Sequence, residues 1–333
     1  MRIENLLRIT NGRLLNSPSI DAFEGIATDS SKVCRGDLFI DIKDSNEDIQ
    51  NAIKNGAYAI IAQHLPSKAI DEEVAYLHVA SIEKSMLKLG RFLSAQKNIK
   101  FTIIDAVQKA LLVSLGLSRK IKILSSGWIN ILKELQKASE NDHFFILDET
   151  IANTLNPQSK PLIKTANLLN CSSKGLFLTS FAHNQKVYQD IKIPSFFLDP
   201  LGKILAYLDE NSIEYKLESL CHIEHFFPLF ITQKIKKKEF GTTDRVLIFE
   251  KDKTLFLQEK AYLSKKIPSF DLLFCMPTTK KNLHVEKNVF FYSECKDFEA
   301  LCKYVFKYAL VLGDKNDFED FLNRDVVVQA SLF

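Results

Sequence analysis

Short apolar runs alternate with amphipathic segments through the first quarter of the chain. Residues 36–42, GDLFIDI, form an apolar run bounded by turn residues and predict a buried strand. Residues 46–57 then place apolar side chains at helical spacing, with Gly56 at the end, where a glycine commonly stops a helix. Residues 58–64, YAIIAQH, predict the next strand. A strand, a helix and a second strand in this order favour a βαβ unit.

The same alternation continues in the middle of the chain. Residues 82–96 have apolar side chains at helical spacing, and residues 100–117 predict a strand that leads into a helix beginning near Asp105. Further strands are predicted at HFFILDE (143–149), GLFLTSF (175–181) and IPSFFLD (193–199). Because these strands alternate with helical stretches, the pattern predicts a parallel sheet.

A polar stretch separates this region from the last part of the chain. Residues 233–244, QKIKKKEFGTTD, are rich in lysine and include Gly241, which favours a linker. We therefore expect three domains, at residues 1–82, 83–232 and 241–333. In the last domain, strands are predicted at 245–250, 270–276, 288–293 and 308–313, with an amphipathic helix at 298–309.

Composition narrows the class of protein. With 333 residues and 46% hydrophobic content, the chain is long enough for two or three packed domains. Its 44 basic and 41 acidic residues leave a net charge of +3, so no large basic field predicts a nucleic-acid partner. The start of the sequence lacks a signal-peptide pattern and no apolar run approaches the ~20 residues of a membrane helix, so we expect a cytoplasmic protein without membrane insertion. The six cysteines have no C-x-x-C spacing, which predicts neither a disulfide framework nor a zinc site.

The segment 28–61, TDSSKVCRGDLFIDIKDSNEDIQNAIKNGAYAII, is the most specific string in the chain. It resembles the N-terminal domain of Mur ligases, whose pattern reads D-S-R-x-V-x-x-G-D-L-F, then a helix, then G-A-x-A. The residues in register are Asp29, Ser30, Val33, Gly36, Asp37, Leu38, Phe39, Gly56, Ala57 and Ala59. The resemblance implies an α/β, Mur-ligase-like architecture: an N-terminal uridine-nucleotide-type domain, a shortened central parallel-sheet domain and a small C-terminal α/β domain.

In the family, this first domain holds the uridine-nucleotide end of the muramyl precursor. The resemblance therefore implies a substrate-binding role for Asp29, Ser30, Ser31, Gly36 and Asp37. Ser31 stands where the family usually has an arginine, which would clamp an anion with two hydrogen bonds. Residues 43–48, KDSNED, replace a stretch that usually carries Gly and a D-G-H motif. The alternative stays open that Gly36 and Asp37 only form a tight turn before a buried strand.

The phosphate-binding loop of the family is strongly altered. An active Mur ligase has a glycine-rich loop ending in Lys and a hydroxyl residue, whose N–H groups wrap the phosphates. Lys109 keeps its position here, but the glycine positions hold Thr102, Asp105 and Gln108, and Ala110 replaces the hydroxyl. Side chains obstruct close backbone approach, and the Asp105 carboxylate would face an anionic ligand. The sequence therefore predicts that this loop does not bind phosphate and that Lys109 is a solvated helix residue.

Two further residues match the family's metal-binding positions. Glu149, beside Asp148, is the counterpart of a metal-binding Glu, and His183 is the counterpart of a metal-linked His. Together with Lys109 they form the catalytic set that the resemblance implies, and we interpret all three as relics, with no metal site. At the end of the chain, residues 312–315, LGDK, stand where active members often show K-G-S-R.

Two other clusters have ordinary structural interpretations. Residues 221–225, CHIEH, hold possible metal ligands, and Cys221 and His225 would share one face of a helix, but no second ligand pair lies at plausible spacing. The lysines at 234 and 236–238 suit a solvated linker, because no aromatic residues lie among them.

The function predicted from these features is that of a catalytically inactive Mur-ligase-like protein, a binding or scaffolding partner in peptidoglycan precursor synthesis. Its expected partners are cell-wall synthesis proteins or the UDP-muramyl precursor, with no cofactor. One alternative is an active ligase that adds D-alanyl-D-alanine to the UDP-muramyl tripeptide, using ATP and magnesium with an unusual loop around Lys109. Another is a structural or interaction protein that binds no nucleotide.

Overall fold

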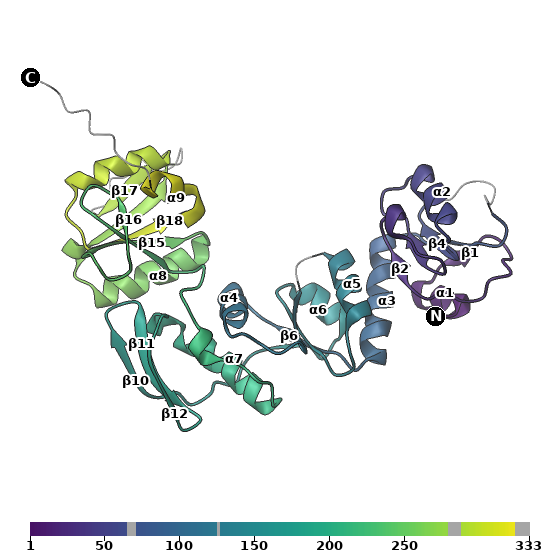
Figure 1. The fold of residues 1–333 in the computed structure, drawn as a ribbon, viewed down its shortest axis with the longest axis horizontal. Helices are drawn as coiled ribbons and strands as arrows, with labels where there is room; N and C mark the ends of the chain where they lie inside the picture. Colours follow the sequence, from purple (N-terminus) through teal and green to yellow (C-terminus); the bar gives the residue numbers. More distant parts are fainter. Residues whose placement is uncertain (65–70, 125–126, 279–287, 324–333) are drawn as a thin grey trace, which may run out of the picture. The chain divides into compact units, whose positions relative to one another are not determined.

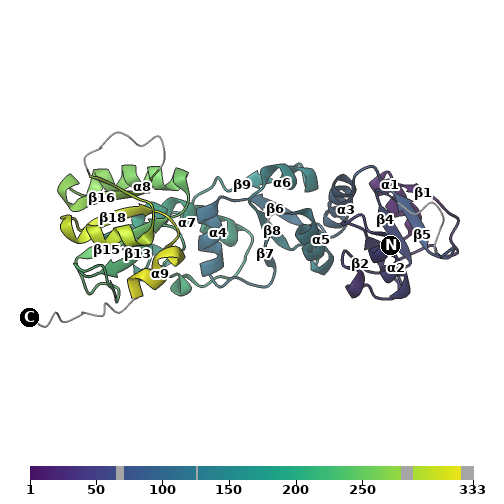
Figure 2. The same cartoon turned by 90° about the horizontal axis from the view of Figure 1, so that it is seen from above.

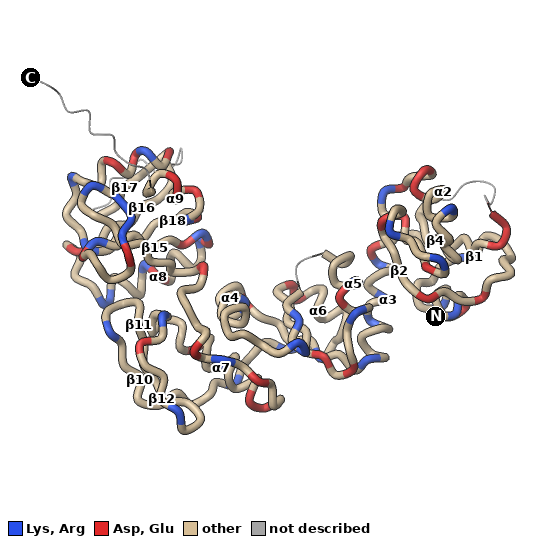
Figure 3. Tube along the Cα trace, viewed as in Figure 1, with Lys and Arg blue, Asp and Glu red and all other residues tan. Residues whose placement is uncertain are grey.

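The computed structural model describes residues 1–64, 71–124, 127–278 and 288–323, which form two compact units. The first unit contains residues 1–109 and 118–163, and the second contains residues 110–117 and 164–333 (Figure 1). Figure 3 shows lysine and arginine interspersed with aspartate and glutamate along the trace of both units. Within the described ranges, no helix has both the length and the apolar character needed to cross a membrane.

A five-stranded sheet with the order β1-β5-β4-β3-β2 opens the first unit. Its strands β2 to β5 are parallel and β1 pairs antiparallel with β5. Successive residues of β3 alternate between two cores: Leu38 and Ile40 pack with helices α1 and α3, and Phe39 packs with α2. The bounds are α1 Ile3–Thr10, β1 Arg13–Leu14, β2 Ile26–Ala27, β3 Leu38–Ile40, α2 Asn46–Lys54, β4 Ala59–Ala62, β5 Ala75–His78 and α3 Ile82–Gln96.

Local signals set the ends of α2. The Ser45 side chain caps the helix by accepting the Asp48 N–H at 3.2 Å. After the helix, Gly56 adopts φ +95°, and an added Cβ would lie 3.0 Å from Arg35 Cα. Glycine is therefore required there for both the backbone conformation and the close approach.

A second, fully parallel sheet with the order β7-β8-β6-β9 completes the first unit. Helix α3 packs against α5 and α6, and Gly90 allows this approach because an added Cβ would lie 3.0 Å from Leu155 and 3.3 Å from Leu135. The bounds are β6 Lys100–Ile103, α4 Ala106–Ser114, β7 Ile121–Leu124, α5 Trp128–Lys137, β8 His143–Ile146, α6 Glu149–Leu155 and β9 Lys160–Pro161. The residues of α4 from Ala110 onward belong to the second unit.

The second unit begins with an antiparallel sheet that the sequence pattern did not predict. Strands β10 (Leu169–Lys174), β11 (Leu178–His183) and β12 (Lys186–Ile191) form a meander, whereas residues 175–181 were expected to join the central parallel sheet. The short turns after Lys174 and His183 enforce antiparallel pairing, because a parallel partner needs a long crossover. The strand predicted at 193–199 is also absent there: these residues form a 3₁₀ turn and the start of helix α7 (Leu198–Glu210).

A six-stranded sheet with the order β14-β13-β15-β18-β16-β17 closes the chain. Figures 1 and 2 show helices α8 and α9 on opposite faces of this sheet. Strands β15, β18, β16 and β17 are parallel, and β13 is antiparallel to β15. The bounds are β13 Phe227–Ile231, β14 Lys237–Lys238, β15 Arg245–Glu250, α8 Lys253–Lys266, β16 Leu272–Pro277, β17 Val289–Tyr292, β18 Tyr308–Leu312 and α9 Lys315–Asn323.

The lysine-rich stretch differs from the predicted linker. Strand β13, placed before the expected boundary at 232, pairs with β15 in the last sheet, and β14 lies inside the supposed linker. The side chains of Ile231 and Ile235 are buried in the core and anchor the turn between β13 and β14. The lysines therefore belong to a β-hairpin. The helix predicted at 298–309 is a shorter 3₁₀ segment, η5 (Cys295–Lys303). The α/β class with parallel sheets is confirmed.

Candidate functional site

Helix α4 begins where the altered phosphate loop was predicted, directly after strand β6. Its start is closed by two reciprocal hydrogen bonds: the Gln108 N–H donates to the Asp105 carboxylate at 2.8 Å, and the Asp105 N–H donates to Gln108 Oε1 at 3.0 Å. This is the arrangement of a capping box. The N–H groups that could bind an anion at this helix end are thus partly satisfied by the chain's own side chains.

The neighbouring positions leave little room for a ligand. Thr102 and Gln108, which replace glycines, are buried, and so is Ala110 at the position of the magnesium-binding hydroxyl. Lys109 is half-buried on α4. The site therefore contains a carboxylate on a helix N-terminus and a single lysine one turn further along.

Removal of the cap should cost stability in proportion to one lost capping interaction. We expect Asp105→Ala to lower the free energy of unfolding by about 1 kcal/mol, whereas Asp105→Asn, which keeps an acceptor oxygen, should lower it by a few tenths. Urea denaturation followed by far-UV circular dichroism measures both changes. Equal stability of Asp105→Ala and the wild type would show that the cap does not close the helix in solution.

Glu149 lies at the same edge of the parallel sheet as the start of α4. Strands β6 and β8 pair with Ile103 opposite Ile146, so the segments after both strands leave the sheet side by side. The side chain that caps α6 is Asp148, which accepts the Ile151 N–H at 3.0 Å, whereas Glu149 is exposed. Both helix starts at this edge therefore carry an aspartate cap.

His183 lies in the other compact unit, at the end of β11. It is buried, and its Nε2 lies 3.0 Å from Tyr215 Oη and 3.1 Å from an oxygen of Asp209. The Tyr215 hydroxyl also donates to Asp209 at 2.8 Å, and burial raises the pKa of Tyr215. This nitrogen is therefore engaged with α7 and the segment after it, within the second unit.

The five candidate substrate residues lie at two opposite edges of the first sheet. Asp29, Ser30 and Ser31 follow β2 at its carboxyl end, whereas Gly36 and Asp37 precede the parallel strand β3. At the carboxyl edge, Asp29 accepts hydrogen bonds from the N–H and hydroxyl of Ser31, which lower the pKa of Asp29. At the other edge, Asp37 accepts the Cys34 N–H at 2.8 Å.

The carboxyl edge of this sheet holds further acidic residues that the motif did not identify. Ser30 donates to Asp48, which also lies 3.1 Å from Lys43. Asp41, at the end of β3, is buried, and this burial raises its pKa although it accepts the N–H groups of Lys43 and Ser45. A further carboxylate there, Asp44, pairs with His64. Lys32 lies 3.4 Å from Asp29, so lysines and carboxylates lie side by side at this edge.

A buried polar cluster in the second unit was also missed. His225 Nδ1 lies 3.0 Å from both carboxylate oxygens of Glu250, the last residue of β15. The Asp252 N–H donates to the same carboxylate at 2.7 Å. Glu259, on α8, is fully buried, and its oxygens have no hydrogen-bond partner within the described ranges. Burial and the nearby Glu250 charge raise the pKa of Glu259 to about 10, so Glu259 is neutral at pH 7.

The possible metal ligands at 221–225 point to separate partners. His225 pairs with Glu250, Glu224 pairs with Lys251, and Cys221 is exposed. Across the part of the chain that the structure describes, no group of three His, Cys, Asp or Glu side chains could hold a metal ion.

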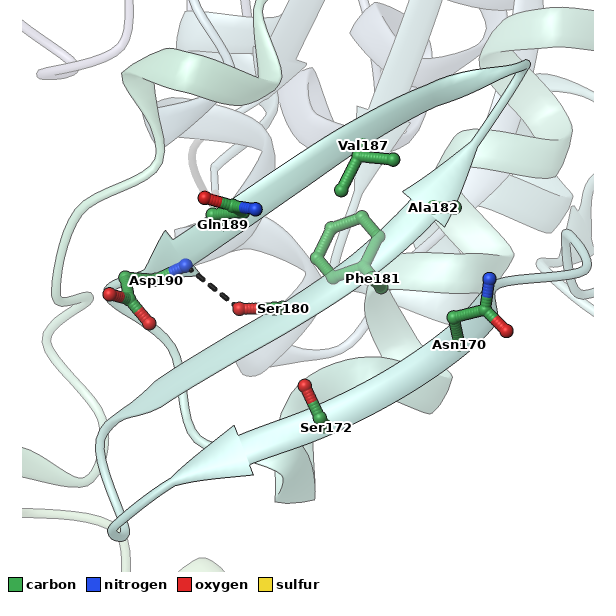
Figure 4. Close-up of a pocket in the computed structure, with 8 residues that line it drawn as sticks. All are labelled: Asn170, Ser172, Ser180, Phe181, Ala182, Val187, Gln189 and Asp190. Atoms are coloured by element: carbon green, nitrogen blue, oxygen red, sulfur yellow. Dashed lines mark hydrogen bonds between the residues drawn. The ribbon is translucent and has the colours of Figure 1, made fainter.

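The pockets do not bring the candidate residues together. A cavity of about 650 Å³ in the first unit is lined by Asp37 and Gly25 among others, without the other candidates. Figure 4 shows a pocket of about 300 Å³ on the antiparallel sheet, where the Asp190 N–H donates to Ser180 Oγ at 3.0 Å. Its lining residues are Asn170, Ser172, Ser180, Phe181, Ala182, Val187, Gln189 and Asp190. With Asp190 as its one charged residue, this pocket has no convergent catalytic groups.

Solved structures of Mur ligases share this fold. UDP-N-acetylmuramoylalanyl-D-glutamyl-2,6-diaminopimelate–D-alanyl-D-alanyl ligase from Acinetobacter baumannii is 10% identical, with 96% of this chain and 97% of that chain covered and a TM-score of 0.51. A MurF crystal structure from the same organism is 10% identical, covers 96% of this chain and 97% of that chain, and has a TM-score of 0.53. MurF ligase from Thermotoga maritima, solved in complex with ADP, is 13% identical, covers 91% of this chain and 92% of that chain, and has a TM-score of 0.51. No protein-family model matches the sequence, and no curated protein matches it. The predicted Mur-ligase-like fold is confirmed, and at this identity the likeness concerns the fold alone.

Proposed function

We propose that this chain is a Mur-ligase-like protein without ATP-driven ligation, which acts as a binding partner in peptidoglycan precursor synthesis. The capping box of Asp105 and Gln108 carries the proposal. It occupies, with a carboxylate of the chain itself, the helix end that a phosphate-binding loop would offer to a nucleotide. A second observation supports the proposal: the buried Ala110 stands where the family has the hydroxyl that binds magnesium, so this position offers no side-chain oxygen ligand.

The partner that we propose is a protein of cell-wall synthesis. The carboxyl edge of the first sheet presents Asp29, Asp44 and Asp48, with Lys32 at 3.4 Å from Asp29 and Lys43 at 3.1 Å from Asp48. Three carboxylates against two lysines leave this edge with a net negative charge. This surface suits a protein contact better than the pyrophosphate of a UDP-muramyl precursor, because like charges repel across a short distance. Titration with UDP should therefore give no thermal shift, and a shift comparable to that of an active ligase would contradict this choice of partner.

Thermal unfolding with magnesium-ATP tests the loss of ligation. A nucleotide at ~100 times its dissociation constant would add about 2.7 kcal/mol to native stability. For units of this size that corresponds to a rise of roughly 5–10 °C in the unfolding temperature. We expect no such rise at millimolar ATP, and no ATP hydrolysis in the presence of the precursor.

The MurF ligase from Thermotoga maritima, solved with ADP, is the positive control for both assays. A clear rise for this chain that Lys109→Ala removes would support the ligase alternative instead. Precursor-dependent hydrolysis by the pure protein would overturn the proposal outright.

A further inference from the structure

Large apolar side chains are exposed at the amino-terminal edge of the six-stranded sheet. Val305 is 87% exposed, Phe270 71% and Tyr304 41%. Val305 and Tyr304 precede β18, and Phe270 precedes β16. The Lys307 N–H donates to the Asp271 carbonyl oxygen at 2.9 Å, which fixes these two strand starts side by side. We call Phe270, Tyr304 and Val305 the apolar tip.

The apolar tip rests on an ordered base. Phe306, directly after Val305, is buried in the core of the sheet, and Leu301, before Tyr304, is fully buried. The Tyr304 carbonyl oxygen accepts a hydrogen bond from Arg245, and its ring packs edge-on against Phe290 at 5.6 Å. The tip is therefore held outward by packed neighbours, and a cluster of exposed apolar groups marks an interaction surface.

Basic residues surround the apolar tip. The segments 263–271 and 302–308, which carry it, contain four lysines and one aspartate. Asp271 is already paired with Lys307 at 3.2 Å, so its charge is compensated. The exposed Lys265, Lys266 and Lys303 remain, with the exposed Asp244 near the start of β18, so the local charge is still positive. Lys266 also donates to Ser195 Oγ at 3.0 Å. The net charge of +3 over the whole chain conceals this local excess.

We propose that this edge docks reversibly onto an anionic lipid surface. Phe270, Tyr304 and Val305 would enter the headgroup region, while Lys265, Lys266 and Lys303 remain at the level of the lipid phosphates. A lipid bilayer can deform around a protruding apolar tip, whereas an acidic protein would need a groove of matching shape. The apolar tip with its lysines therefore favours a bilayer as the partner. The inference is independent of the proposed function, because it uses neither the start of α4 nor the first sheet.

Sedimentation with lipid vesicles tests the proposal on the full chain. We expect binding to vesicles of phosphatidylcholine with phosphatidylglycerol, weak binding to phosphatidylcholine alone, and release at about 0.5 M salt, where the screening length is only a few ångströms. The double variant Lys265→Gln/Lys303→Gln should bind about 30-fold more weakly, since each lysine near such a surface contributes about fivefold. Phe270→Ser/Val305→Ser should bind at least about tenfold more weakly.

Matched controls locate the effect. Val187→Ser removes a valine of β12 that is 64% exposed, and Lys133→Gln removes an exposed lysine from α5. Both should bind vesicles as the wild type does, and all variants should keep the wild-type circular dichroism spectrum. Equal binding by the tip variant and the wild type would overturn the proposal. So would an absence of vesicle binding at low salt, or binding to polyglutamate without binding to anionic vesicles, which would indicate an acidic protein partner.

Discussion

Glu259→Gln is expected to stabilise the second unit by about 3 kcal/mol at pH 7. An unfolded glutamate ionises near its ordinary pKa of 4.5, whereas burial and then the Glu250 charge raise the folded pKa of Glu259 to about 10. Folding therefore takes up a proton between these two values, and the free energy of unfolding falls by about 1.4 kcal/mol per pH unit in this window. Glutamine takes up no proton, so its advantage is absent below pH 4.5 and grows as the pH rises.

Chemical denaturation at pH 4, 7 and 9 measures this effect. Trp128, the only tryptophan, lies in the first unit, so its fluorescence reports that unit while circular dichroism reports both. We expect the circular dichroism transition to shift and the fluorescence transition to stay. Glu214→Gln, which changes an exposed glutamate of the second unit, is the control. A pH-independent difference between Glu259→Gln and the wild type would contradict a protonated Glu259.

Elements with strong local signals were predicted well. The run at 36–42 is strand β3, and the helix expected at 46–57 is α2, with its cap at Ser45 and its stop at Gly56. The helix expected near Asp105 is α4. In each of these, an apolar period coincides with a capping residue or a glycine in the left-handed region, so two short-range signals agree.

Strand orientation depended on contacts that the local pattern does not encode. Residues 175–181 are as apolar as a central parallel strand, yet β11 pairs antiparallel on both sides. The turns before and after β11 hold the deciding residues: Gly175, Asn184 and Gln185 all have positive φ. The lysine-rich hairpin was misjudged for a similar reason, because a single isoleucine among the lysines, Ile235, anchors its turn in the core.

The sequence predicted which types of residue lie at the candidate site better than it predicted their positions in space. The sequence placed a carboxylate at the start of α4, and the structure shows that Asp105 and Gln108 close it together, at a spacing visible in the sequence. The position of His183 could not be predicted, because its partners Asp209 and Tyr215 lie more than twenty residues away along the chain. The resemblance places His183 at a metal-linked position, which we interpret as a relic, and its contacts in the structure are with Asp209 of α7 and with Tyr215.

One overlooked signal identifies the buried glutamate. In α8, the buried residues Phe256, Glu259 and Leu263 follow the i, i+3, i+7 spacing of an apolar helix face. A glutamate on such a face either has a partner or is neutral, because a lone buried charge is too costly. Residues 246, 248 and 250 of β15 lie on one face of the strand, because side chains alternate along a strand. Glu250 therefore lies on the same face as two buried apolar residues.

His225→Leu is expected to destabilise the second unit by about 3 kcal/mol, the effect of leaving a buried carboxylate without its side-chain hydrogen-bond donor. It removes the imidazole that lies 3.0 Å from both Glu250 oxygens and leaves that carboxylate with backbone donors only, chiefly the Asp252 N–H. Glu250 would then be a buried charge without its side-chain partner. Urea denaturation by circular dichroism measures the loss, with the Trp128 transition again expected to stay.

The double variant His225→Leu/Glu250→Met separates the pair from ordinary packing. Replacing both partners removes the charge together with its imidazole, so the double variant should be more stable than His225→Leu alone. The coupling energy of the cycle should be about 2 kcal/mol, within the range for residues in direct contact. Additive effects would mean that His225 contributes through its volume, and the buried Glu250 would then be stabilised by the backbone of the β15–α8 turn rather than by the imidazole. Because Glu259 lies beside the same carboxylate, its raised pKa should also fall toward the ordinary value in Glu250→Met, which links the two tests.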